Sequence, residues 1–176
     1  IVGGINRKSA EMTKELYEIF VQGAIHLTDA TTAELVKVME NTYRDVNIAF
    51  ANELAKMAEK LDVNIWEAIK FANYHPRVNV HFPGPGVGGH CIAVDPWFLV
   101  ELGGDTAQII HLARNTNDSM PSYTAQKTQS ILNKAGIAGA TVAVRGLAFK
   151  GNIDDMRESP STIVIDELQK LGLNVI

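Results

Sequence analysis

The sequence predicts a mainly helical region over residues 1–140, followed by the beginning of a parallel α/β region. Three observations predict this fold class. No Gly or Pro occurs from Thr31 to beyond Leu61, apolar residues recur at helical spacing on both sides of that stretch, and a strand–helix–strand pattern follows Thr141. Because two strands do not make a stable parallel sheet alone, we expect the α/β region to be truncated.

The first two helices are predicted from their apolar spacing and their termini. Ser9 precedes apolar residues at helical spacing, and Gly23 is expected to end that helix. The second helix is expected to begin at Thr31, which has capping-box spacing to Glu34. It can run for about 30 residues, or about 45 Å. A helix of this length cannot bury its apolar face within a small domain, so it predicts a domain spine or a subunit interface.

Shorter elements follow. Asn64 is expected to cap a helix that stops at His75–Pro76. Asp95 followed by Pro96 predicts an N-cap and the first helical position. Further helical patterns follow Asp105 and Pro121 and end near Gly136, a strand covers residues 142–147, a helix begins at Ser159–Pro160, and residues 173–176 form a second strand. The last three elements predict a β-α-β unit.

Composition excludes several classes of protein. The chain has 176 residues, of which 46% are hydrophobic and 20% charged, and it carries a net charge of −4. This charge gives no reason to expect nucleic acid or an anionic membrane as a partner. There is no apolar run of membrane-spanning length, and the N-terminal residues do not resemble a signal peptide. The single cysteine allows no internal disulfide, which favours a reducing, cytoplasmic location.

The segment Pro83–Cys91 has the composition of a ligand-binding loop. Four of the six residues from Gly84 to Gly89 are glycines, which let the backbone approach a ligand and direct N–H groups at an anion or an oxyanion. Cys91 ends the loop, where a following helical turn would favour its thiolate. The alternative is a Gly/Pro turn beside a buried cysteine, because free cysteines are among the most buried residues.

Other polar residues have both functional and structural interpretations. Lys37, Asn41 and Arg44 share one face of the long helix, either around a substrate oxygen or as a solvated stripe whose charge Glu40 and Asp45 balance. His75 and Arg77 lie at a helix end, where Arg77 can bind phosphate or sugar hydroxyls. Asp95 can orient a base or a water near Cys91 as well as cap its helix. Lys150 and Arg157 flank a strand–loop–helix junction that suits a phosphate, although no dinucleotide fingerprint is present.

Together, three segments resemble the nucleotide-sugar 6-dehydrogenases. They are Lys37–Asn41 within residues 33–53, the loop that ends in Gly88–Gly89–His90–Cys91–Ile92, and Gly146–Lys150 followed by Asp154–Pro160. Their order and spacing match over nearly the whole chain. Within this family, the segments 41–47, 75–78 and 90–98 resemble the enzymes that act on UDP-N-acetylmannosamine.

The resemblance implies a three-part architecture. Residues 1–28 would be the tail of an NAD-binding Rossmann domain that is otherwise missing, residues 29–120 a helical central dimerisation domain with the catalytic cysteine, and residues 121–176 a linker helix and the first β-α-β unit of a truncated UDP-binding domain. It implies a homodimer through the long helix. It also implies NAD as the cofactor and a UDP-sugar as the substrate.

The resemblance also implies roles for individual residues. Cys91 would attack a sugar aldehyde, Lys37 and Asn41 would stabilise the reacting oxygen, and Asp95 would assist proton transfer. Arg157 would contact NAD. Substrate-binding roles fall on Ile1, Lys37, Asn41, Arg44, His75, Arg77, Gly88, Phe149 and Lys150.

Three alternatives remain open at this level. The chain can be a non-catalytic dimerisation and UDP-sugar-binding fragment, or a related UDP-glucose or UDP-N-acetylglucosamine 6-dehydrogenase. It can also be a cysteine hydrolase that uses Cys91 with His90, although the sequence offers no evident Asn or Asp to orient that histidine.

Overall fold

The computed structural model describes residues 1–176, and the chain divides into two compact units, residues 1–41 and 42–176. The first unit contains β1 (Val2–Gly4), α1 (Arg7–Glu18) and β2 (Leu27–Asp29). β1 and β2 are parallel, with Val2 opposite Leu27. A Cβ at Gly3 would lie 2.6 Å from the Cβ of Ala33, so glycine is needed where this strand passes the start of the following helix. This strand pair was not predicted.

The first helix begins earlier than predicted. Asn6 is its N-cap and accepts a hydrogen bond from the backbone N–H of Ser9, while the Ser9 side chain accepts one from the backbone N–H of Asn6. Ser9 is therefore the third helical residue and part of a capping box, so the helix begins before the position that the sequence predicted. The helix also ends at Glu18, well before Gly23.

The predicted long helix is confirmed as α2 (Ala30–Lys60), which has 31 residues. Its predicted start was wrong in detail. Asp29, not Thr31, accepts the hydrogen bond from the backbone N–H of Thr32, at 2.9 Å. The same carboxylate accepts the Thr32 hydroxyl, and these bonds lower the pKa of Asp29. A carboxylate at this end of a helix is also favoured by the helix dipole.

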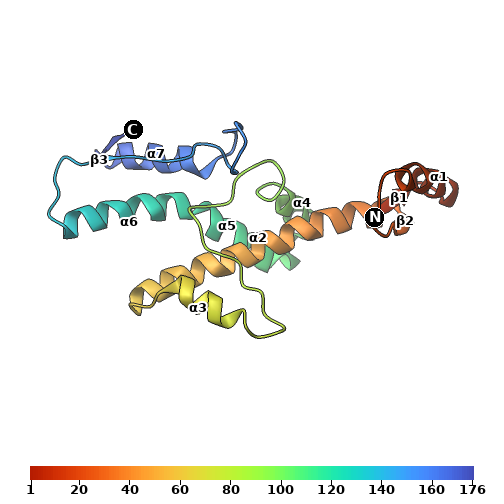
Figure 1. Ribbon diagram of the computed structural model, residues 1–176, viewed down its shortest axis with the longest axis horizontal. Helices are drawn as coiled ribbons and strands as arrows, with labels where there is room; N and C mark the ends of the chain where they lie inside the picture. The colour runs from red at the N-terminus through yellow and green to blue at the C-terminus, as the bar shows by residue number, and fades with distance from the viewer. The chain divides into compact units, whose positions relative to one another are not determined.

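The second unit contains the C-terminal part of α2 and the remaining elements (Figure 1). These are α3 (Ile65–Ala72), α4 (Asp95–Gly103), the short 3-10 helix η1 (Gly104–Thr106), α5 (Gln108–Asp118), α6 (Met120–Lys134), β3 (Thr141–Val142), α7 (Pro160–Lys170) and β4 (Asn174–Val175). Asn64 caps α3 as predicted, accepting from the backbone N–H groups of Trp66 and Glu67. Asp95 was expected to be an N-cap but is the first residue of α4, because the turn of residues 91–94 leads directly into the helix.

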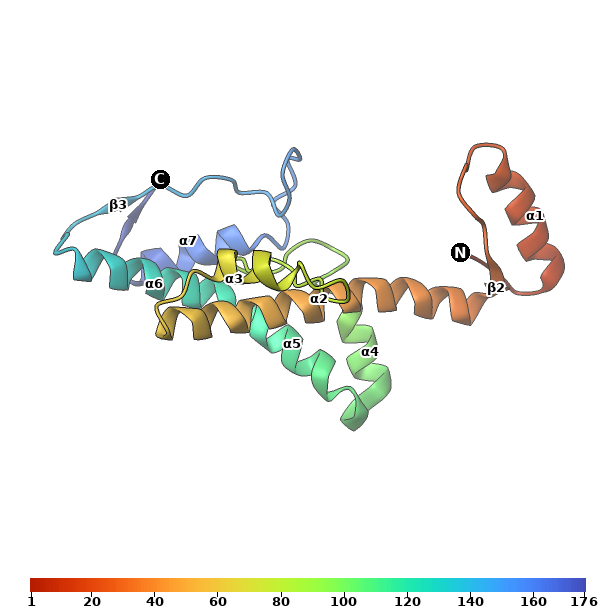
Figure 2. The ribbon, with the colours of Figure 1, turned by 60° about the horizontal axis from the view of Figure 1, so that its bottom comes forward.

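The predicted β-α-β unit is confirmed. β3 and β4 are parallel, with Thr141 opposite Asn174, and α7 connects them. Helix α6 lies alongside α7 in both views (Figures 1 and 2). Ala125 of α6 packs with Val164 and Leu168 of α7 in a small core, against which the apolar residues of both strands pack. The first strand is shorter than the predicted span of residues 142–147.

None of the helices combines the length and apolar character needed to cross a membrane.

Candidate active site

The loop Pro83–Cys91 packs tightly against the segment that precedes α7. The backbone N–H of Gly89 donates to the carbonyl of Glu158 at 3.3 Å. A Cβ at Gly88 would lie 2.5 Å from Cδ of Pro160, and one at Gly89 would lie 2.7 Å from the ring of Phe149. Gly89 also has a φ of +88°, a conformation that side chains disfavour. Gly88 and Gly89 are thus required for the close packing of this loop on the protein itself, and the predicted approach of the loop to a ligand stays a prediction.

A cleft of about 740 Å³ lies where these two segments meet. Gly88 lines one part of it, Phe149 and Lys150 line another, and the start of α7 at Ser159 and Pro160 closes it. The Ser159 hydroxyl accepts the backbone N–H of Ser161 and so caps the helix. A helix N-terminus beside a lysine and an aromatic ring suits a phosphate attached to a planar base. The structure therefore brings three of the predicted substrate residues, Gly88, Phe149 and Lys150, to one cleft.

An ion-pair cluster joins the two segments beside this cleft. Nε2 of His90 lies 3.2 Å from Oδ2 of Asp155, and Arg157 donates to both oxygens of the same carboxylate. The hydrogen bonds from Arg157, supported by the one from His90, hold the pKa of Asp155 well below its usual range. The His90 ring also meets the edge of Phe149, with centroids 5.9 Å apart. The expectation that no carboxylate would orient His90 was therefore wrong, since Asp155 comes from 65 residues further along the chain.

Cys91 is exposed, which contradicts the alternative of a buried cysteine. Its carbonyl accepts the backbone N–H groups of Val94 at 3.1 Å and Asp95 at 2.7 Å, so the turn into α4 fixes its backbone. The predicted pair Cys91 and Asp95 are thereby brought within one turn of each other. Cys91 does not line the 740 Å³ cleft, but it follows Gly88, which does, by three residues.

The remaining predicted residues do not line this cleft. Lys37, Asn41 and Arg44 are on α2, where Lys37 and Arg44 are exposed and Asn41 is buried. Ile1 is exposed in the first unit. His75 and Arg77 are exposed after α3, and the backbone N–H of Arg77 donates to Nδ1 of His75 at 3.3 Å. Arg157 is largely exposed and is held by Asp155.

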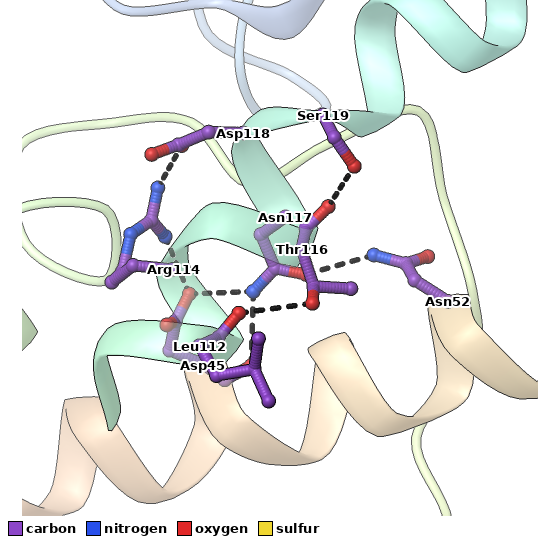
Figure 3. Close-up of polar contacts among 8 residues, drawn as sticks. All are labelled: Asp45, Asn52, Leu112, Arg114, Thr116, Asn117, Asp118 and Ser119. Atoms are coloured by element: carbon purple, nitrogen blue, oxygen red, sulfur yellow. Dashed lines mark hydrogen bonds and ion pairs between the residues drawn. The ribbon is translucent and has the colours of Figure 1, made fainter. Parts of the chain in front are cut away.

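A buried polar network in the second unit was missed (Figure 3). Asp45 is fully buried and pairs with Arg114 of α5 at 2.5 Å, so it does not balance Arg44 on the helix surface as expected. Asn117 and Asn52 extend the network and are also fully buried. The available signal was spacing, because Asp45 and Asn52 are seven residues apart on α2 and Arg114 and Asn117 are three apart on α5.

Comparison with known proteins assigns the two segments that form the cleft, the Pro83–Cys91 loop and the segment before α7, to two different domains of one family. Residues 31–119 match the central domain of the UDP-glucose/GDP-mannose dehydrogenase family, and residues 143–176 match its UDP-binding domain. The chain belongs to this family. Its matched UDP-binding segment contains Phe149 and Lys150 of the cleft, and its matched central segment contains the Pro83–Cys91 loop.

Individual relatives are similar over almost the whole chain. A UDP-N-acetyl-D-mannosamine dehydrogenase of Methanococcus maripaludis is 56% identical over 99% of this chain and 41% of its own length. An NDP-N-acetyl-D-galactosaminuronic acid dehydrogenase of Ralstonia nicotianae is 48% identical over 98% of the chain and 41% of its own length. A solved UDP-D-ManNAc dehydrogenase from Pyrococcus horikoshii superimposes with a TM-score of 0.92 at 46% identity, covering 98% of this chain and 42% of that one. The chain thus spans about two fifths of the length of these relatives.

Proposed function

We propose that this chain is the central part of an NAD-dependent dehydrogenase that oxidises UDP-N-acetyl-D-mannosamine to UDP-N-acetyl-D-mannosaminuronate. The observation that carries the proposal is the contact between the cysteine loop and the cleft at the start of α7. Gly88 belongs to both, so a nucleotide sugar with its diphosphate at α7 can extend its sugar toward Cys91. The choice of sugar follows the names of the most similar relatives.

The reaction assigns a covalent role to Cys91. Oxidation of the sugar C6 alcohol gives an aldehyde, and the Cys91 thiolate adds to its carbon to form a thiohemiacetal. Removal of a second hydride leaves a thioester. Water then attacks the acyl carbon, the C–S bond breaks, and the carboxylate leaves as Cys91 regains its thiol. NAD supplies the hydride acceptor for both oxidations, so each sugar reduces two NAD molecules.

Lys37 and Asn41 provide the polar groups for the reacting oxygen. The ammonium of Lys37 stabilises the developing oxyanion, and Asn41 holds the oxygen in place. Asp95 begins the helix that follows Cys91 and assists the proton relay. Arg44, His75 and Arg77 position the sugar and phosphates, with Arg77 coming from a partner subunit, and Ile1 contacts the substrate.

Arg157 is the residue of this chain assigned to NAD. Its guanidinium is largely exposed, and Asp155 holds its orientation through two hydrogen bonds. A fixed, exposed guanidinium fits the negative charge of a dinucleotide.

We also propose a homodimer through α2. Large apolar side chains are exposed at seven-residue intervals on this helix, at Tyr43, Phe50 and Met57, which are 59%, 51% and 53% exposed. Such a heptad stripe is typical of helices that pair. Pairing would cover apolar surface that is otherwise in contact with water.

The test is NADH production by the full-length enzyme supplied with UDP-N-acetyl-D-mannosamine. We expect two NADH per sugar, and we expect Cys91→Ala to release no carboxylate. Lys37→Ala should reduce the rate strongly, whereas Lys60→Ala, at the far end of the same helix, should not. Full activity of Cys91→Ala would disprove the covalent mechanism, and faster turnover of another UDP-sugar would reassign the substrate.

Two alternatives predict other results. A non-catalytic UDP-sugar-binding fragment would bind the substrate but reduce no NAD. A cysteine hydrolase would tolerate Lys37→Ala. The carboxylate beside His90 would favour the hydrolase, but the His90 ring makes no hydrogen bond to the Cys91 thiol, and Arg157 already engages both oxygens of Asp155.

A further inference from the structure

The loop that carries Cys91 is anchored at its beginning by one buried side chain. The backbone N–H of Gly84 donates to Oδ1 of Asn52 at 2.8 Å. Asn52 lies on α2 and has no exposed surface. The end of the loop is held separately, by the hydrogen bond from Gly89 to Glu158. Asn52 is thus a side-chain anchor between the long helix and the first turn of the loop.

The hydrogen bonds behind Asn52 fix the orientation of its amide. Nδ2 of Asn52 donates to Oδ1 of Asn117 at 2.8 Å. Nδ2 of Asn117 donates to Oδ1 of Asp45 at 2.8 Å and to its carbonyl at 3.0 Å. Reversing either amide would set two donors or two acceptors against each other, because Gly84 can only donate and the Asp45 oxygens accept. These hydrogen bonds can therefore run in only one donor-to-acceptor direction, from Gly84 through Asn52 and Asn117 to Asp45.

A buried ion pair lies at the end of this series of hydrogen bonds and fixes its donor-to-acceptor direction. Nη1 of Arg114 donates to Oδ1 of Asp45 at 2.5 Å, and Arg114 is only 1% exposed (Figure 3). The same oxygen of Asp45 also accepts the hydrogen bond from the Asn117 amide. Oδ2 of Asp45 and Nε of Arg114 are buried without a partner, but the atoms that link Asp45, Asn117 and Asn52 are all hydrogen-bonded. The linked atoms favour one arrangement, since each broken bond would leave a further buried polar group without a partner.

We infer that Asn52, oriented by Asn117 and the Asp45–Arg114 pair, is a positioning residue that sets where the Cys91 loop begins. It touches neither the cleft nor the thiol, so it acts through the loop backbone. The effect of Asn52 on the loop backbone follows from the Gly84 hydrogen bond. Its effect on turnover rests on the proposed function, in which Cys91 is the nucleophile. A small displacement of a nucleophile reduces turnover more than it reduces substrate binding.

The experiment combines hydrogen exchange, thiol alkylation and kinetics on the full-length enzyme. In Asn52→Ala, we expect amide exchange in residues 83–91 to rise by about tenfold or more, because the Gly84 donor loses its acceptor. We expect the rate of Cys91 alkylation by iodoacetamide to change, and kcat to fall about tenfold with KM nearly constant. Asn47→Ala is the matched control, since Asn47 lies on the same helix but bonds only to the carbonyl of Tyr43.

A second pair of variants changes the donor of the same hydrogen bond, should Asn52→Ala not fold. Gly84→Pro removes the donor, whereas Gly84→Ala keeps it, and a Cβ at Gly84 meets no atom within 4 Å. We expect only the proline variant to raise exchange in the loop. Exchange and alkylation in Gly84→Pro or Asn52→Ala within twofold of the control would overturn the inference. Hydrogen exchange and alkylation are measured without turnover. An active Cys91→Ala enzyme would therefore disprove the proposed mechanism but leave the inference about Asn52 and the loop untouched.

Discussion

Replacing Arg114 by methionine should destabilise the protein strongly, and by an amount that depends on pH. The Asp45 and Arg114 side chains are 0% and 1% exposed, and the variant leaves the Asp45 carboxylate buried without its cation. Burial already raises the pKa of Asp45, and Arg114 is the largest effect that opposes this rise. Without Arg114 the carboxyl will take up a proton on folding. For a carboxyl of ordinary pKa, that uptake costs about 1.4 kcal/mol per pH unit, or about 4 kcal/mol at pH 7.

The sign of the pH dependence follows from the direction of this shift. A carboxyl whose pKa is raised on folding favours the folded state below its unfolded pKa, and this contribution is lost as the pH rises. The cost of this proton uptake falls to about 1.5 kcal/mol at pH 5, so the destabilisation caused by Arg114→Met should be smaller at pH 5 than at pH 7. Asp118, the second partner of Arg114, is half exposed and will regain water when the arginine is removed, so it should add little.

Urea unfolding at pH 5 and pH 7, followed by circular dichroism, measures this difference. The double variant Asp45→Asn/Arg114→Met is the control, because it has no buried carboxyl and its stability loss should be nearly equal at the two pH values. A loss below about 1 kcal/mol, or an equal loss at both pH values in the single variant, would refute the reasoning.

Three further predictions concern other parts of the chain. Gly89→Ala should reduce the free energy of unfolding by about 1–2 kcal/mol through its positive φ alone, whereas Gly84→Ala should change it little; equal losses in urea unfolding would contradict the strain assigned to the positive φ of Gly89. Burial and the hydrogen bond to Glu59 raise the pKa of Tyr123 to about 12, so Glu59→Gln should lower the midpoint of its absorbance titration at 295 nm, and an unchanged midpoint would exclude this contact. Phe50→Glu should shift the protein toward monomer in sedimentation equilibrium, and an unchanged mass would exclude pairing through this face of α2.

Local rules predicted several elements well. The absence of Gly and Pro after Thr31 predicted the long helix, and Asn64 was recognised as a cap because its bonds reach only two and three residues ahead. The β-α-β order was also visible, since alternating apolar strands and a capped helix have distinct periods. Helix starts were less accurate, because Asn6 and Asp29, which precede the predicted Ser9 and Thr31, accept backbone N–H groups in the first turn.

The candidate site was predicted in composition but not in arrangement. Glycine spacing identified the Pro83–Cys91 loop, and the residues Phe149 and Lys150 were recognised through the family resemblance. Their meeting in one cleft depends on the packing of Gly88 and Gly89 on the segment before α7, more than 55 residues away in sequence. The carboxylate beside His90 was missed for the same reason.

By itself, the sequence determined which segments are helical, which loop is rich in glycine and carries the cysteine, and which family the chain resembles. These properties depend on backbone preferences and on contacts a few residues apart. Only the tertiary structure decided that Asp45 is a buried partner of Arg114 and that Asn52 supports the start of the cysteine loop. Burial of a polar residue is set by neighbours distant in sequence, and the same Asp or Asn on a helix can face water or a partner until those neighbours are in place.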